Sequence, residues 1–124
     1  MRTPLAHARG LGSAKDGTEH FWRQRVTAVA LIPLSFWFVV SLIAMAGADH
    51  VAVIAWLKQP VPACAMLLFI GTGFVHLRLG VQVVIEDYVE GEAAKIACLM
   101  LNTFFCAAAG LLSALAVLKI FFGA

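Results

Sequence analysis

The sequence has 124 residues, of which 62% are hydrophobic and only 13% are charged, about half the charged share of soluble domains. Its mean hydropathy is +0.92, and a soluble domain of this size could not bury so much apolar surface. These values exclude a soluble enzyme, a nucleic-acid-binding protein and a disordered tail. We therefore expect an all-α protein of the lipid bilayer with three transmembrane helices.

Residues 1–24 are polar and rich in glycine and basic side chains. They are not a secretory signal, because the first apolar run begins late and lacks a small-residue cleavage site. We expect a cytoplasmic N-terminal arm over residues 1–24, mostly flexible and ending in an interfacial stretch at 18–25. A three-helix anchor domain is expected to follow at 25–122.

The first span is expected at about 26–47, a run of 22 residues without a charge. At 1.5 Å per residue this run crosses a hydrocarbon core of roughly 30 Å. Pro33 lies inside the span and is expected to bend the helix, which a membrane helix tolerates. The next apolar piece, residues 51–57, is too short to span, so we expect it to lie along the membrane interface.

Two further spans are expected at about 62–85 and 93–122, separated by the acidic turn 86–92. The last span is longer than a bilayer requires, so it should tilt or protrude. Its small residues at 107–110 predict a close contact with another helix.

The basic residues predict the orientation of the spans. Five of the nine Lys and Arg residues precede the first span, and the first loop holds only Lys58. The positive-inside rule then places the N-terminus in the cytoplasm. With three spans, the acidic turn 86–92 is also cytoplasmic and the C-terminus lies outside.

His76 is the main candidate for chemistry, because an ionisable group inside a span is costly and is usually functional. It lies twelve residues before Tyr88, about 18 Å along a helix and near the middle of the bilayer. The small residues Thr72, Gly73 and Gly80 share its face and leave room for a flat cofactor or a second helix. Two interpretations stay open: an axial haem ligand, or a neutral histidine that is hydrogen-bonded to a neighbouring helix.

A haem with two axial ligands would need a partner chain. The other histidines, His7, His20 and His50, lie outside the spans, and Met100 in the third span is expected to be a packing residue. We therefore expect this chain to supply half of any such site.

Charged and phenolic groups at the span ends are further candidates. Arg25 fits either a membrane anchor or a partner for a haem propionate. The neighbours Asp87 and Tyr88 fit either a quinone site, where the hydroxyl donates to a carbonyl, or a tyrosine of the aromatic belt beside a solvated acid. Arg78 points about 200° away from His76, and its role stays open. No nucleophile–base pair, zinc spacing or phosphate loop is present, so no catalytic residue is expected.

The segment 76–89 resembles the second-helix signature of the hydrophobic membrane anchor subunits of succinate dehydrogenase. The resemblance rests on His76, Gly80, Gln82, Val83, Asp87, Tyr88 and Val89. Residues 17–28 are similar to the start of that family's first helix. The resemblance covers roughly residues 17–122, and the sequence resembles alphaproteobacterial or mitochondrial-like members of the family.

The resemblance implies a three-helix anchor in the bacterial inner membrane, paired with a second membrane anchor (cytochrome b) subunit. Together they would bind haem b and hold the iron–sulfur and flavoprotein subunits, so that electrons from succinate reach ubiquinone. By position, His76 would be the axial ligand of the haem iron, and Arg25 would lie near the propionates and the quinone. Asp87 and Tyr88 would bind the quinone. The chain would belong to an oxidoreductase without catalysing a reaction alone.

Two alternatives stay open at this stage. One is the anchor of a fumarate reductase-type complex that works with menaquinone. The other is a small membrane scaffold or transporter without a cofactor.

Overall fold

The computed structural model describes residue 4 and residues 14–123, and within that part of the chain every regular element is an α-helix. Side chains are described at residue 4 and from residue 18 to residue 123. The helices are α2 (Ala14–Ala44), α3 (His50–Leu57), α4 (Pro60–Tyr88) and α5 (Glu92–Phe122). Three of them, α2, α4 and α5, are long and apolar enough to cross a membrane. The expectation of an all-α membrane protein with three spans is confirmed.

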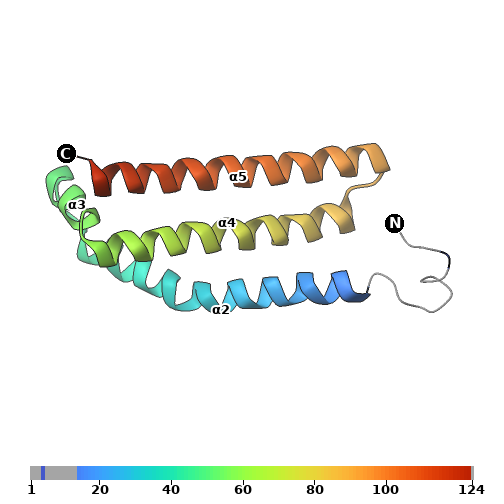
Figure 1. Cartoon of the computed structure of the whole chain (residues 1–124), viewed down its shortest axis with the longest axis horizontal. Coiled ribbons are helices and arrows are strands. Elements are labelled where there is room, and N and C mark those ends of the chain that lie inside the picture. The colour runs from blue at the N-terminus through green and yellow to red at the C-terminus, as the bar shows by residue number, and fades with distance from the viewer. Residues whose placement is uncertain (1–3, 5–13, 124) are drawn as a thin grey trace.

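The three long helices lie side by side and run in alternating directions, with α4 in the middle (Figure 1). α4 packs against both α2 and α5, while the short α3 contacts α4 and α5 at one end of the bundle. The charged end of the bundle, as we call it, is the opposite end, where α2 begins and α4 ends. Because α4 is central, its residues contact both α2 and α5.

α2 begins earlier than the sequence indicated. The helix starts at Ala14 and continues into the candidate span Thr18–Ala44, whereas the arm was expected to be mostly flexible up to an interfacial stretch at 18–25. An ion pair between Arg23 and Glu19, one helical turn apart, supports the helix in this polar part. The expected flexibility is therefore wrong for residues 14–17, and the expected interfacial stretch 18–25 is helical. Residues 1–3 and 5–13, including His7, lie outside the described residues.

The short helix α3 matches the expected apolar piece at 51–57. Asp49 caps it, because the Asp49 carboxylate accepts a hydrogen bond of 2.9 Å from the Ala52 backbone N–H. The Trp56 ring stacks on Trp37 of α2 with centroids 5.8 Å apart. α4 then begins at Pro60, a residue whose missing N–H is harmless in the first turn of a helix. α2 contains Pro33 and is bent in its second half (Figure 1).

The small residues of α5 make the close contact that the sequence predicted, at Gly110. A Cβ atom added there would lie 3.4 Å from the ring and Cβ of Phe74 on α4. Ala107 and Ala108 of the same run are exposed. Gly110 is therefore a position of this run at which α4 and α5 approach closely.

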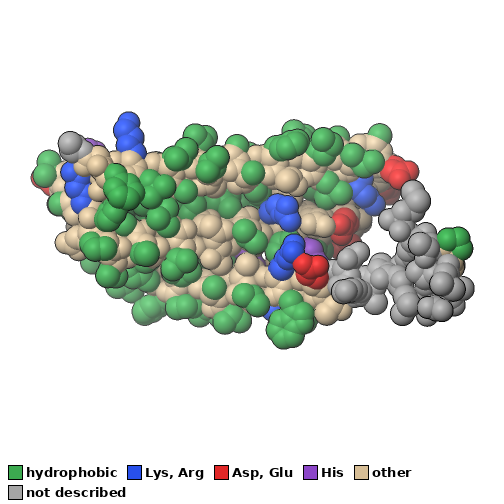
Figure 2. Space-filling model, in the orientation of Figure 1, with side chains coloured by type: hydrophobic (Ala, Val, Ile, Leu, Met, Phe, Trp, Pro, Cys, Tyr) green, Lys and Arg blue, Asp and Glu red, His purple; other side chains and the backbone are tan. Residues whose placement is uncertain are grey.

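The outer surface of the bundle is mainly apolar. Hydrophobic side chains cover much of the face in Figure 2, and most charged side chains gather toward the charged end. Many large apolar residues are more than half exposed, among them Ile32, Phe36, Val51 and Leu101. Lipid or a partner chain, rather than water, is the environment in which such a surface is stable.

Candidate functional site

His76 lies where α4 packs against α2, and it is half-buried. Its Nδ1 atom is 3.0 Å from the hydroxyl oxygen of Thr27. That hydroxyl also lies 2.7 Å from the Arg23 carbonyl and 3.1 Å from the Gln24 carbonyl, to which it donates. A hydroxyl has only one hydrogen, so we assign the proton between Thr27 and His76 to Nδ1, which donates to the Thr27 oxygen. In this tautomer Nε2 carries a free lone pair.

The contacts of α2 with α4 fix the depth of His76 in the bundle. Thr27 lies opposite His76, and a Cβ atom added to Gly80 would lie 3.7 Å from the Gln24 amide nitrogen. Because Thr27 is the second residue of the charge-free run, His76 is level with the beginning of that run. It therefore lies less deep in the apolar part of the bundle than the count from Tyr88 predicts, because α4 continues past the apolar part of α2.

The face beside His76 is open at one glycine and filled at the other. No atom lies within 4 Å of a Cβ atom added to Gly73, whereas the Gln24 side chain lies next to Gly80. Gly73 also lines an apolar hollow of about 180 Å³ with Phe69, Ile70, Phe74 and Leu77. A flat apolar group could therefore approach α4 on the Gly73 side, one turn from the imidazole.

Arg25 does not lie beside His76. Its guanidinium carbon is 4.9 Å from the centre of the Phe21 ring, and it lines a groove of about 350 Å³ formed by α2 alone. Arg25 precedes Thr27 by two positions, so the two side chains lie about 200° apart around α2. It is therefore available to a group outside this chain.

Asp87 and Tyr88 end α4 at the charged end, and both are exposed. The exposed fraction of Tyr88 is 80%. Asp87 comes eleven residues after His76, which returns it to the same side of the helix. The carboxylate and the phenol can thus meet a ligand or a partner chain without displacing any packed side chain.

Two polar residues inside the spans were not singled out from the sequence, Thr27 and Asn102. The Asn102 amide donates a hydrogen bond of 3.0 Å to the Arg78 carbonyl and so joins α5 to α4. A polar side chain within a charge-free run was the available signal for both. Met100 was expected to be a packing residue, but it is 53% exposed on α5.

Comparison with known proteins identifies the family. The model of the succinate dehydrogenase/fumarate reductase transmembrane subunit family matches residues 1–111. The chain belongs to this family. It is a membrane-anchoring subunit of the succinate dehydrogenase type and a multi-pass protein of the bacterial inner membrane.

Curated relatives of the family carry matching names. The succinate dehydrogenase hydrophobic membrane anchor subunit of Paracoccus denitrificans is 38% identical over 95 residues, which cover 77% of this chain and 74% of the relative. The subunit of the same name from Rickettsia bellii is 38% identical over 73% of this chain and 72% of its own. The succinate dehydrogenase membrane anchor subunit of Reclinomonas americana is 30% identical, over 70% and 75% respectively. No solved structure matches the chain.

Proposed function

We propose that this anchor subunit holds one haem b between itself and a second membrane anchor (cytochrome b) subunit, and that it helps to bind ubiquinone. In the assembled complex, an iron–sulfur subunit and a flavoprotein subunit would dock at the charged end, and the positive-inside rule supports a cytoplasmic position for that end. The haem would supply one-electron transfer. The task of this chain is to bind, to orient and to set the charge around these groups.

The observation that carries the proposal is the hydrogen bond between His76 Nδ1 and Thr27 at 3.0 Å. Histidines that bind a metal nearly always donate their second ring N–H to a fixed acceptor, which sets the tautomer and the direction of the ring. Thr27 supplies that acceptor, and the free Nε2 is the ligand atom. The uncovered Gly73 beside it supports the approach of a flat ring. The second axial ligand would come from the partner subunit.

Arg25, Asp87 and Tyr88 would act at the edge of the same interface. The outward position of Arg25 suits a haem propionate or a quinone that is shared with the partner subunit. The Tyr88 hydroxyl can donate a hydrogen bond to a quinone carbonyl, and Asp87 can relay or tune the proton. The exposure of both residues supports this role.

The first test replaces the ligand. We expect His76→Ala to abolish most of the b-type absorbance in a reduced-minus-oxidised spectrum of the purified complex. Of the other described histidines, His20 lies at the polar start of α2 and His50 lies in the short α3, so neither should replace the His76 imidazole. His50→Ala, at the far end of the bundle in α3, is the matched control and should keep the spectrum. Unchanged haem absorbance in His76→Ala would refute the ligand assignment. A wild-type complex with no haem at all would favour a cofactor-free scaffold.

The second test removes only the phenolic oxygen of Tyr88. Tyr88→Phe should lower the rate of quinone reduction by roughly tenfold, the value of one hydrogen bond to a polar partner. Succinate oxidation with a soluble artificial acceptor and the subunit composition should stay at the wild-type level. Native quinone turnover and affinity in Tyr88→Phe would exclude a direct contact. The quinone extracted with the wild-type complex separates ubiquinone from menaquinone and so tests the fumarate reductase-type alternative.

A further inference from the structure

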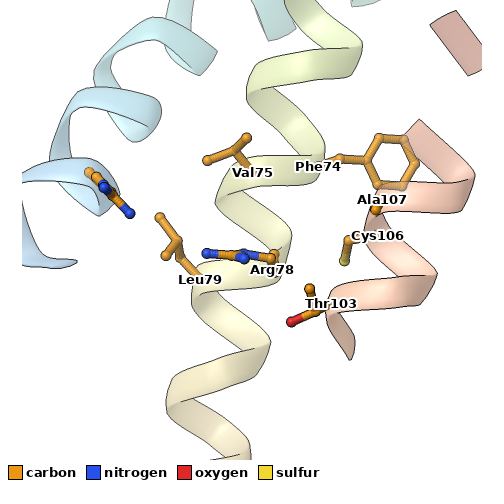
Figure 3. Close-up of a pocket in the computed structure, with 8 residues that line it drawn as sticks. Phe74, Val75, Arg78, Leu79, Thr103, Cys106 and Ala107 are labelled. Carbon is orange, nitrogen blue, oxygen red and sulfur yellow. The ribbon is translucent and has the colours of Figure 1, made fainter. Parts of the chain in front are cut away.

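Two arginines from different helices line one groove on the bundle. Arg78 of α4 and Arg23 of α2 line a hollow of about 400 Å³. Its remaining lining residues are mostly apolar: Phe74, Val75, Leu79, Thr103, Cys106 and Ala107. Figure 3 shows Arg78 extending from α4 on the side toward α2, with Cys106 and Ala107 across from it on α5. The groove thus joins all three long helices.

The mouth of this groove is polar. A second hollow of about 240 Å³ shares Arg23, Arg78 and Leu79 with the first and adds Glu19, His20 and Gln82. None of the proposed haem and quinone residues lines either hollow. Arg78 also lies about 200° around α4 from His76. The groove therefore uses other side chains than the proposed haem and quinone site.

The charges in the groove do not balance within the described part of the chain. Arg23 pairs with Glu19, but no described carboxylate pairs with Arg78. The backbone carbonyl of Arg78 accepts a hydrogen bond from Asn102, which leaves its guanidinium donors unused by that contact. A lone guanidinium in a membrane span is costly unless an anion or the headgroup region neutralises it.

The depth of the groove matches the layering of a lipid leaflet. The pairing of Thr27 with His76 places Arg78 level with the first residues of the charge-free run of α2. Phe74 lies one helical turn, about 6 Å, further into the span than Arg78. Ala107 and Cys106 of α5 line the same groove as Phe74. Positive charge at the membrane edge is therefore followed by an apolar channel toward the middle.

We propose that this groove binds an anionic phospholipid of the leaflet at the charged end. Its phosphate would lie between Arg23 and Arg78, whose planar guanidinium groups suit paired hydrogen bonds to phosphate oxygens. One acyl chain would follow the apolar channel past Phe74 and Ala107. Basic pockets between membrane helices commonly take lipid headgroups. The apolar channel favours a lipid over free phosphate, because only a lipid has an acyl chain that can lie in it.

The test counts lipids on the intact complex. Wild type, Arg78→Gln and the double variant Arg23→Gln/Arg78→Gln would be purified in detergent, delipidated and titrated with phosphatidylglycerol or phosphatidylcholine in mixed micelles. Native mass spectrometry gives the number bound. We expect wild type to hold one phosphatidylglycerol more than the double variant. The affinity of the double variant for phosphatidylglycerol should be lower than that of wild type by roughly tenfold or more. Lys119→Gln, an exposed lysine near the opposite end, should bind as wild type does.

A further variant separates a lipid from a small anion. Ala107→Leu narrows the apolar channel and keeps both arginines, so it should weaken phosphatidylglycerol binding, and excess inorganic phosphate should not displace the lipid. This variant also carries the test if the double variant does not assemble. Equal binding in Ala107→Leu, equal binding of the two lipids, or displacement by inorganic phosphate would each overturn the proposal. Loss of haem in Arg78→Gln without loss of lipid would instead assign Arg78 to the haem.

Discussion

The central helix α4 packs against its two neighbours in different ways. Toward α5 the contact is close and mainly apolar, with Phe74 against Gly110 and with Cys106 only 4% exposed. Toward α2 the contact includes the polar pair His76 and Thr27, and apolar stacking of Phe38 on Phe69 lies further along, with ring centres 4.7 Å apart. The interface between α4 and α5 is suited to hold the bundle together. The interface between α4 and α2 fixes the tautomer of the His76 imidazole.

Unsatisfied polar groups make the same distinction. Gln24 Oε1 is buried without a hydrogen-bond partner on the α2 side, at the level where Gly80 faces the same side chain. Buried orphan acceptors are rare and destabilising, so they persist mainly where a ligand or partner completes them. The α2 side therefore holds an acceptor that no described group of this chain satisfies, which agrees with the site proposed there. The Asn102 contact on the α5 side is already complete.

The largest expected structural effect comes from filling the close contact with α5. In Gly110→Leu the added atoms begin 3.4 Å from Phe74, so the leucine must displace that ring or separate the helices. We expect a loss of about 1–3 kcal/mol in stability, measured as a lower melting temperature of the purified complex. The haem spectrum of the complex that still assembles should be normal, because α5 lies away from His76.

Two glycine controls sharpen this prediction. Gly71→Leu on α4 should melt as wild type does, since no atom lies within 4 Å of a Cβ atom added there. Gly110→Ala should have a small effect, because 3.4 Å is an ordinary van der Waals distance. If Gly110→Leu melts like the wild type, the α5 contact is not the tight one and the comparison fails.

Much of the fold was predictable from the sequence, because long charge-free runs have few stable alternatives in a membrane. The start of α2 was not, since residues 14–24 are polar and carry no hydropathy signal; their helix depends on local pairs such as Arg23 with Glu19. His76 was predictable as a rare ionisable group inside a span. Its partner Thr27 was not, because the register of two helices is set by packing between residues 49 positions apart.

The next effect should appear on the α2 side. Thr27→Val removes the hydroxyl at nearly constant volume, so His76 Nδ1 loses its acceptor and the ring is no longer held. Loss of such a supporting partner typically weakens metal binding by about 10–100-fold, which we expect as faster loss of haem from the complex. Thr27→Ser keeps the oxygen and should retain haem as the wild type does. Equal haem retention in the valine and serine variants would show that the hydrogen bond does not support the ligand.

The smallest effect should come from the polar contact on the α5 side. Asn102→Ala removes the hydrogen bond to the Arg78 carbonyl, but that carbonyl lies within α4 and keeps its acceptor role in the helix. Hydrogen bonds between membrane helices average about 0.6 kcal/mol, so the melting temperature of the complex should fall only slightly and less than in Gly110→Leu. Haem content should not change. A loss in Asn102→Ala as large as in Gly110→Leu would mean that hydrogen bonding, not close packing, holds α5 to α4, and the contrast between the two sides of α4 would then rest on His76 and Thr27 alone.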